Sequence, residues 1–425
     1  MRVYEEPPRD LLGSRWPDVS ADNQLLGVVN PILMRVKAEG DSALIRFTEM
    51  FDGVRLSPGE LEVGEEEVEA AYSMVTEEQV AALKESKRRL EAVESTRLEG
   101  LCFSVELDGV DVRSAVKPLG RVGCYVPGGK AAYPSSLVMN VVPAKIAGVD
   151  LVVVCTPPGK DKRISPLTLV AADICHADKV YRVGGAQAVA AMAYGTETVP
   201  RVDKIVGPGN RYVTAAKAAA SDAVAVDKPA GPSEVLVLAD GTADPRLIAL
   251  DIISQAEHGP GGLVGLVTTS PRVAEGVERL LSELVAKAPR SRVVEEVLGE
   301  GGFIYTVDSV DEAIAFAEAF APEHLEVMTA EPRLVAEKVS SAGLVLVGPY
   351  TPVSSTDYCM GANHVLPTGG YAKISSGITV LDYLRPVTVV ESTREGLLKV
   401  RDHVKALSDA EGLPNHGLAV GGRFQ

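Results

Sequence analysis

Hydrophobic positions in the first quarter of the chain recur with helical spacing. Between Ala21 and Ala38, apolar residues return every three or four positions, which is typical of a helix that buries one face. The same spacing predicts helices at Asp41–Phe51 and Glu65–Glu94, the second with a long charged face. Residues 1–20 are polar and hold three prolines, so we expect a polar arm there. The sequence therefore predicts a helical N-terminal region.

After Val116, short β-branched runs alternate with alanine-rich segments. This alternation predicts βαβ units and hence a parallel sheet. The expected strands are Val122–Val126, Leu151–Cys155, Lys179–Val183, Lys204–Val206 and Glu234–Leu238. The expected helices are Ser135–Ala147, Pro166–Ile174, Ala186–Tyr194 and Arg211–Ala220. A second series of the same kind runs from Asp244 to Val347, with strands expected at Leu263–Thr268, Gly302–Thr306, Glu326–Met328 and Leu344–Val347.

Residues 348–386 show little periodicity and are rich in glycine, serine and threonine. An irregular segment of this length in a compact protein is usually functional or disordered, and its histidine, cysteine and tyrosine favour a structured site. A strand at Thr388–Val390, a helix at Thr393–Leu407 and a tail over 408–425 complete the chain. We therefore predict an α/β fold with two Rossmann-like parallel-sheet domains facing a cleft, the helical N-terminal region and a small C-terminal tail domain.

Composition narrows the possible classes of function. The chain has 425 residues, which is enough for two or three domains. Its net charge of −16 argues against a nucleic-acid partner and against an anionic membrane surface. No apolar run reaches the roughly 18 residues that a membrane span needs, and the acidic start resembles neither a secretory signal nor a transit peptide. Five cysteines without a CxxC motif indicate reduced thiols, so we expect a cytoplasmic protein.

Four glycine-containing turns lie beside predicted strands. They are Tyr125–Gly129, Arg182–Gln187, Val206–Asn210 and Pro229–Ser233. In the first three a strand ends and a helix begins, and there glycine lets backbone N–H groups approach a phosphate. The fourth precedes a strand, and the GxGxxG dinucleotide fingerprint is absent, so tight turns without a ligand are the alternative. The number of turns, with the amides of Gln187 and Asn210 alongside, favours a nucleotide cleft.

Two further stretches hold side chains suited to chemistry. Gln255 and His258 are three residues apart at the end of a predicted helix, where they could bind a metal or simply face the helix dipole. Glu323 and His324 precede a short strand and could be an acid–base pair or a surface ion pair. His258, His364 and His416 all lie in irregular or helix-terminal sequence, where zinc sites are commonly built.

Six motifs together identify a family resemblance. They are YVPGGKAAYPSSLVMNVVPAKIAGV, VGGAQAVAAMAYGTETVPRVDKIVGPGNRYVTAAK, AGPSEVLVLAD, SQAEHGPGG, FAPEHLEV and SSTDYCMGANHVLPTGGYAKISSG. With these motifs the sequence closely resembles the histidinol dehydrogenase family, zinc enzymes that use NAD and end histidine biosynthesis. The resemblance covers about residues 20–423, and its SQAEHGP, PEHLE and NHVLPT stretches are highly specific.

The resemblance implies roles for individual residues. The zinc ligands would be Gln255, His258, Asp357 and His416. The catalytic pair would be Glu323 and His324. The substrate, L-histidinol, would contact Ser233, His364 and Glu411, together with His324 and the four zinc ligands. NAD would contact Tyr125, Gln187 and Asn210. The family is a homodimer whose C-terminal tail reaches the partner's active site, so Glu411 and His416 would serve the neighbouring subunit.

The predicted domain boundaries follow the same grouping. The arm is 1–20, and the first α/β domain combines 21–118 with 234–380 and holds the zinc and catalytic residues. The second α/β domain is 119–233 and holds the NAD contacts. The tail domain is 381–425 and reaches the partner subunit.

The implied reaction is the four-electron oxidation of L-histidinol to L-histidine by way of histidinal, with two NAD and one water. We predict that His324 takes the hydroxyl proton and that Glu323 activates the water, while one zinc per subunit holds the substrate by its nitrogens. Covalent catalysis through Cys124 or Cys155 is disfavoured, because neither lies beside a base in a site-like stretch. The alternatives are a zinc hydrolase on the same ligands and a ligand-binding regulator without turnover.

Overall fold

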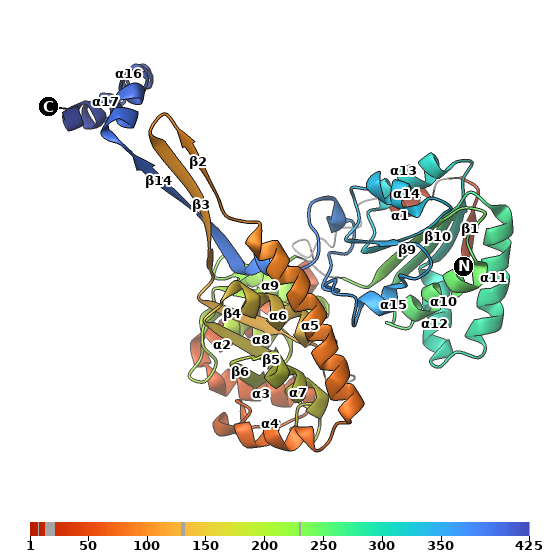
Figure 1. Cartoon of the computed structure of the whole chain (residues 1–425). Coiled ribbons are helices and arrows are strands. Elements are labelled where there is room, and N and C mark those ends of the chain that lie inside the picture. Colours follow the sequence, from red (N-terminus) through yellow and green to blue (C-terminus); the bar gives the residue numbers. More distant parts are fainter. Residues whose placement is uncertain (7, 13–21, 129–131, 229–230, 425) are drawn as a thin grey trace.

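The computed structural model describes residues 1–6, 8–12, 22–128, 132–228 and 231–424 and shows an α/β protein with two parallel sheets and one antiparallel sheet (Figure 1). In each parallel sheet the strands alternate with helices along the chain, as the sequence predicts. The predicted fold class is thus confirmed. Within the described residues, no helix is both long enough and apolar enough to cross a membrane.

The helical N-terminal region is confirmed, with one break that was not predicted. Its long helices are α2 (Asn23–Glu39), α3 (Asp41–Asp52), α4 (Glu65–Tyr72) and α5 (Glu77–Glu99). The single helix predicted at Glu65–Glu94 is therefore wrong. Thr76 starts α5 with a capping box, because its side chain accepts from the N–H of Gln79 while the Gln79 side chain accepts from the N–H of Thr76.

The predicted arm also contains regular structure. The strand β1 (Arg2–Tyr4) pairs in parallel with the edge of the larger sheet, and the short helix α1 (Arg9–Leu12) follows it. A three-residue strand is too short to show a period, so the sequence pattern does not indicate it. Pro7 and residues 13–21, which include the rest of the arm and the first residue of the first predicted helix, lie outside the described residues.

The smaller parallel sheet has five strands in the order β6-β5-β4-β7-β8. They are β4 (Arg121–Tyr125), β5 (Leu151–Thr156), β6 (Lys179–Arg182), β7 (Lys204–Val206) and β8 (Ala225–Val226). The connecting helices are α6 (Pro134–Ala147), α7 (Pro166–Ile174), α8 (Gly185–Tyr194) and α9 (Arg211–Ala220). Numbered along this segment the order is 3-2-1-4-5, which matches the first five strands of the Rossmann order 3-2-1-4-5-6, with a topological switch point between β4 and β7.

Two hydrophobic cores cover the two faces of this sheet. One core is shared with α2, α3, α8 and α9, and the other with α5, α6 and α7. The residues of β5 alternate between them, with Val153 in the first core and Val152 and Val154 in the second. The N-terminal helices thus pack on the 119–233 segment, which differs from the predicted grouping of 21–118 with 234–380. The division into domains stays a prediction.

The larger parallel sheet has six strands in the order β1-β11-β10-β9-β12-β13. Besides β1 they are β9 (Glu234–Ala239), β10 (Leu263–Thr268), β11 (Gly302–Thr306), β12 (His324–Met328) and β13 (Leu344–Val347). The helices of this part are α10 (Pro245–Ala256), α11 (Pro271–Val285), α12 (Ser291–Glu300), α13 (Val310–Phe320) and α14 (Pro332–Glu337). Without β1 the order is again 3-2-1-4-5, so the two halves of the protein repeat one topology.

The antiparallel sheet is a long ribbon that projects from the smaller parallel sheet (Figure 1). Its strands are β2 (Phe103–Leu107), β3 (Val110–Pro118) and β14 (Leu384–Ser392), and its far end carries α16 (Arg394–Ala410) and α17 (Pro414–Gly421). The strand predicted at Thr388–Val390 is therefore longer, and β2 and β3 were not predicted. The turn at Asp108 and Gly109, both with positive φ, is the hairpin signal in the sequence that indicates them.

Candidate active site

The predicted catalytic pair lies at the amino end of β12 in the larger sheet, beside the amino end of the neighbouring strand β9. Glu323 immediately precedes β12, and β12 pairs with β9 in a register that sets His324 opposite Val235. This register places Glu323 beside Glu234, the first residue of β9. The N–H of Glu234 donates to Oε2 of Glu323 (2.8 Å), and the N–H of Glu323 donates to Oε2 of Glu234 (3.3 Å). The buried carboxylates of Glu234 and Glu323 thus connect the amino ends of β9 and β12 through two hydrogen bonds.

The backbone holds the imidazole of His324 in one tautomer. Its Nδ1 lies 3.2 Å from the carbonyl oxygen of Glu234, and a carbonyl oxygen can only accept, so Nδ1 carries the proton. Nε2 is then the basic nitrogen, and it is buried without a hydrogen-bond partner among the described residues. Burial disfavours the charged ring, but the carboxylate of Glu323, 3.6 Å from Nδ1, and the nearby Asp357 outweigh it and raise the pKa of His324.

His364 joins the two halves of the protein at this site. Its Nδ1 donates to the carbonyl oxygen of Asp357 (2.7 Å), so its Nε2 accepts from the hydroxyl of Ser136, 3.1 Å away. Desolvation lowers the pKa of His364, which keeps the ring neutral. Ser136 lies in the first turn of α6, just after β4 of the smaller sheet, and Asp357 follows the short helix α15 (Val353–Thr356).

A second contact of the same segment ties it to the catalytic strands. The N–H of Gly369 donates to Oε1 of Glu234 (3.0 Å), and the hydroxyl of Thr368 accepts from the N–H of Gly231 (2.6 Å). The irregular segment 357–369 therefore connects the carboxyl end of the smaller sheet with the amino end of the larger sheet. These contacts show that the segment is structured, and its role as a site stays a prediction.

Gln255 and His258 lie at the end of α10, which packs against α15. The side chain of Gln255 is buried, and no described residue donates a hydrogen bond to its Oε1. His258 is exposed two residues beyond the helix. The imidazole of His258 and the carboxylate of Asp357 are donor types that zinc prefers, and the unpartnered amide oxygen of Gln255 is a weaker neutral donor beside them. Within the described part of the chain, no three His, Cys, Asp or Glu side chains are close enough to hold a metal ion.

The predicted NAD contacts gather at the carboxyl edge of the smaller sheet. Tyr125 ends β4, and its hydroxyl accepts from the N–H of Gly185 at the start of α8 (3.1 Å). Gln187 lies in the same turn of α8, fully buried, with no described residue hydrogen bonded to either amide atom. Asn210 caps α9 through its side-chain oxygen. These residues flank the switch point, where open α/β sheets bind their ligands.

A buried ion pair fixes the turn between these residues. Gly207 has a φ of +111° and approaches Tyr125 so closely that a Cβ would lie 2.1 Å from the Tyr125 carbonyl oxygen. The amine of Lys217 donates to the carbonyl oxygen of Gly207 (2.9 Å). The backbone N–H of Gly207 donates to the carboxylate of Asp227 (2.7 Å). Lys217 and Asp227 are also ion-paired with each other. The pair thus holds the glycine in the conformation that the close approach requires.

We expect the Lys217→Met variant to lower the free energy of unfolding by about 3–5 kcal/mol, because it leaves the carboxylate of Asp227 buried without its cation. Urea unfolding measures the change. The control is Lys338→Met, which removes an exposed pair with Asp311 and should change stability little. Equal losses in the two variants would contradict the structural role of Lys217.

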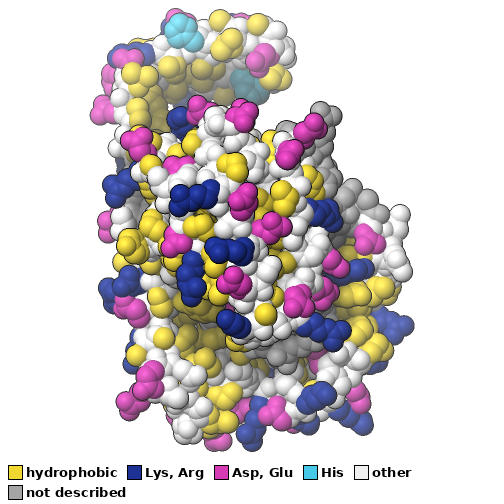
Figure 2. All heavy atoms as spheres, turned by 90° about the vertical axis from the view of Figure 1, so that its right-hand side faces the viewer, with side chains coloured by type: hydrophobic (Ala, Val, Ile, Leu, Met, Phe, Trp, Pro, Cys, Tyr) yellow, Lys and Arg dark blue, Asp and Glu magenta, His cyan; other side chains and the backbone are white. Residues whose placement is uncertain are grey.

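Glu411 and His416 do not join the site within one chain. Glu411 follows α16 and His416 lies in α17, at the far end of the ribbon, whereas α10 and α15 border the larger sheet (Figure 1). Figure 2 shows this end projecting at the top, with histidine side chains at its surface. The ribbon that carries it exposes apolar side chains at Phe103, Val105, Leu107, Val389 and Val390. The predicted ligand set is therefore split between two places in the monomer.

Two residues of the site were not predicted. Glu234 was expected only as the first residue of a strand, and Ser136 only within a helix. Each acts through a hydrogen bond to a distant segment, 89 residues away for Glu234 and 228 for Ser136. Ser233, which was predicted, directly precedes β9. Of the glycine turns, Gly129, Pro229 and Ala230 lie outside the described residues.

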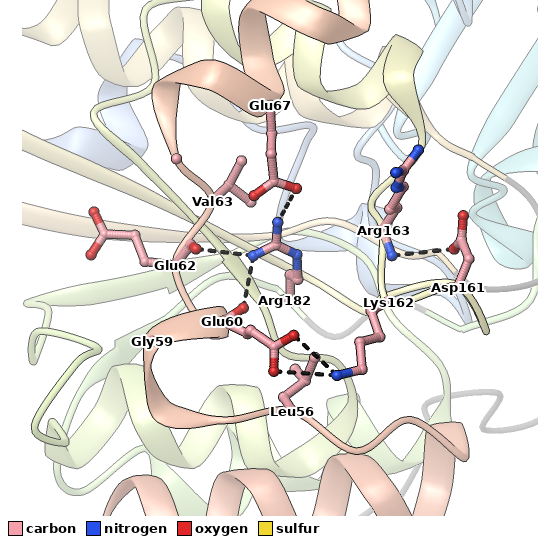
Figure 3. A pocket seen from close by; sticks show the side chains of 11 residues that line it. Leu56, Gly59, Glu60, Glu62, Val63, Glu67, Asp161, Lys162, Arg163 and Arg182 are labelled. Atoms are coloured by element: carbon pink, nitrogen blue, oxygen red, sulfur yellow. Dashed lines mark hydrogen bonds and ion pairs between the residues drawn. The ribbon is translucent and has the colours of Figure 1, made fainter.

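A surface pocket of about 600 Å³ lies elsewhere, beside the end of β6 (Figure 3). The buried guanidinium of Arg182 donates there to the carbonyl oxygens of Glu60 and Glu62 and pairs with Glu67. Lys162 pairs with the carboxylate of Glu60. Because the protein already partners the buried cation, we assign no site to this pocket.

Comparison with known proteins finds relatives over nearly the whole chain. Residues 17–424 match the family model described as histidinol dehydrogenase. The histidinol dehydrogenase of Methanosarcina mazei is 44% identical over 397 residues, which cover 93% of this chain and 91% of that protein. The histidinol dehydrogenase of Methanopyrus kandleri is 45% identical over 431 residues, which cover 100% of this chain and 99% of that protein.

A solved structure extends the likeness to three dimensions. The crystal structure of histidinol dehydrogenase from Elizabethkingia anophelis matches with a TM-score of 0.95 at 34% sequence identity, covering 100% of this chain and 98% of that chain. Sequence and fold agree over nearly the whole length, and the chain belongs to the histidinol dehydrogenase family, oxidoreductases of histidine biosynthesis.

Proposed function

We propose that the protein oxidises L-histidinol to L-histidine by way of histidinal, in two steps that each reduce one NAD. The observation that carries the proposal is the arrangement of His324, whose Nδ1 holds the proton and lies 3.6 Å from the carboxylate of Glu323, while its Nε2 has no hydrogen-bond partner among the described residues. An alcohol loses a proton and a hydride in such an oxidation, and a positioned base of this kind accepts the proton.

In the first step, Nε2 of His324 takes the hydroxyl proton as a hydride leaves the adjacent carbon. The Nδ1–H bond to the Glu234 carbonyl persists, so the ring becomes charged without turning. The carboxylate of Glu323 favours this charged state, because it lies 3.6 Å from Nδ1. The pair therefore stabilises the product of the proton transfer.

In the second step, a water adds to histidinal. Oε2 of Glu323 is held by the N–H of Glu234, and no described residue donates to Oε1, which can accept the proton of the water. The charged ring of His324 returns its proton to the aldehyde oxygen as the water adds. The neutral ring then takes a hydroxyl proton from the hydrate as the second hydride leaves, and the product is the carboxylic acid.

Zinc and NAD suit the two ends of this site. When bound, NAD would accept the hydrides, and zinc would coordinate the imidazole and amine nitrogens of the substrate. The unpartnered Oε1 of Gln255, with His258, Asp357 and His416, would hold the metal. The unpartnered amide of Gln187, with Tyr125 and Asn210, would contact NAD. Ser233, His364 and Glu411 would contact the substrate.

The proposal includes a cytoplasmic homodimer. The apolar ribbon supports it, because exposed Phe103 and Leu107 would be buried against a second copy, and the same ribbon carries Glu411 and His416 away from their own chain's site. The five cysteines are all unpaired, as in a reducing compartment. Cys124 and Cys155 are poor nucleophiles, because burial raises the pKa of the Cys124 thiol and raises that of Cys155 to about 12.

We expect two NADH for each L-histidinol consumed, because one site performs both oxidations. The absorbance of NADH at completion, with limiting L-histidinol and excess NAD, measures this yield, and L-histidine in place of L-histidinol is the control that should give none. One NADH would restrict the protein to alcohol oxidation. No NADH would reject the proposal and favour a zinc hydrolase or a ligand-binding regulator.

A further inference from the structure

Two buried carboxyl groups lie one layer beneath the proposed site. Asp251 on α10 is 8% exposed, and Glu326 on β12 is 1% exposed. Glu326 is two residues after His324, so both side chains leave the same face of the strand. Asp251 is four residues before Gln255, so both lie on the same face of the helix.

The two carboxyl groups lie close enough to raise and lower each other's pKa, and two adjacent buried carboxylates repel each other unless one of them holds a proton. Oε2 of Glu326 is buried, and no N–H or hydroxyl group of the described residues donates to it. Burial and the adjacent Asp251 raise the pKa of Glu326, and burial raises that of Asp251. The nearby His324 has the opposite effect and lowers the pKa of Glu326. Two adjacent buried carboxyls therefore share one proton.

The other oxygen of Glu326 reaches a third element. Its Oε1 accepts from the N–H of Val353 (2.9 Å), the first residue of α15. This helix has only four residues and leads directly into Asp357, so it has few hydrogen bonds of its own to fix its position. The carboxyl pair thus connects α10, β12 and α15.

These three elements are the ones that carry Gln255, His324 and Asp357. We propose that Asp251 and Glu326, sharing one proton, are positioning residues that set the distance between the zinc ligands of α10 and α15 and the base on β12. This inference rests on the proposed zinc-dependent function. A carboxyl pair that shares one proton carries a single negative charge, so it holds the elements with one charge fewer near the metal than two carboxylates would.

The test uses zinc alone as the probe and the full-length protein. The Glu326→Leu variant should bind zinc about 10–100-fold more weakly in competition with a chelator, because groups that orient metal ligands contribute on this scale. The Glu326→Gln variant should bind zinc as the wild type does, since its amide can donate to Asp251 and accept from Val353. Rescue by glutamine and not by leucine is the expected signature, together with a kcat that falls more than KM rises in the leucine variant.

A matched control separates positioning from stability. Glu94 is also a buried glutamate that accepts from a backbone N–H, that of Val380 (2.6 Å), but it joins α5 to a segment without site residues. The Glu94→Leu variant should lose thermal stability and keep the zinc affinity of the wild type. Equal zinc affinity in the Glu326→Leu and Glu94→Leu variants would overturn the inference.

A second variant covers the case in which Glu326→Leu does not fold. Asp251→Leu keeps the contact between Glu326 and Val353 but removes the shared proton, and it should also weaken zinc binding. A folded Asp251→Leu protein with the zinc affinity of the wild type would overturn the inference while leaving the proposed function intact. A wild-type protein that binds no zinc would overturn the zinc proposal and the inference with it, whether or not it yields NADH.

Discussion

The His324→Asn variant is expected to oxidise L-histidinol about 10²–10⁴-fold more slowly than the wild type, with little change in KM. The amide nitrogen of asparagine can still donate to the carbonyl of Glu234, but it has no counterpart of the basic Nε2. Steady-state NADH formation measures both constants. The same loss is expected with histidinal as the substrate, because both oxidations transfer a proton to this ring.

The dependence of the rate on pH provides a check on this assignment. The base must be neutral to act, so kcat/KM of the wild type should rise with pH through the pKa of His324, which lies above its ordinary value of 6.5. The His324→Asn variant should lack this rise. A thermal unfolding curve close to that of the wild type would control for folding. A variant with activity within about tenfold of the wild type would contradict the role of His324.

Co-expressed His258→Ala and His416→Ala chains are expected to form active mixed dimers, although each variant alone should be inactive. In a mixed dimer, one site combines the intact His258 of one chain with the intact His416 of the other. With random pairing of equal amounts, half of the dimers are mixed, so about a quarter of the wild-type activity should return. Differently tagged chains allow the mixed dimer to be purified and assayed.

The control replaces two residues at the same end of α10. Co-expression of His258→Ala with Gln255→Ala leaves no intact site in any dimer and should restore nothing. If His258→Ala with His416→Ala also restores nothing while mixed dimers are present, each site is built from one chain. The position of α17 at the end of the ribbon then needs another explanation.

The sequence predicted helices and strands correctly wherever their buried faces produce a regular pattern of hydrophobic residues. The alternation after Val116 predicted strands and helices of both parallel sheets, because buried strands and their covering helices leave distinct periods. The same approach did not find β2 and β3, since an exposed ribbon has no buried face to impose a hydrophobic period. The break before Thr76 was missed because the charged faces of α4 and α5 read as one continuous helix.

Long-range pairing explains what the sequence could not indicate about the site. Glu323 and His324 were predicted as a pair, but their support by Glu234 depends on β9 and β12 being neighbours, which follows from strand order and not from local pattern. The contact between Ser136 and His364 depends likewise on how two sheets are placed. The two sheets also use opposite edges, since the NAD contacts follow strands and the catalytic pair precedes them. In open α/β sheets, ligands usually bind at the carboxyl ends of the strands, and only the predicted NAD site follows this rule.

The acceptor that sets the tautomer of His324 is a main-chain carbonyl, not a side chain. No amino-acid replacement at position 234 can delete that oxygen, and the pairing of β9 with β12 keeps it in place. Substitutions around the ring can therefore accumulate over evolution without moving the proton from Nδ1. Only a change that shifts β9 against β12 would alter the tautomer of His324. The pairing of these two strands therefore determines which nitrogen of the ring is the base.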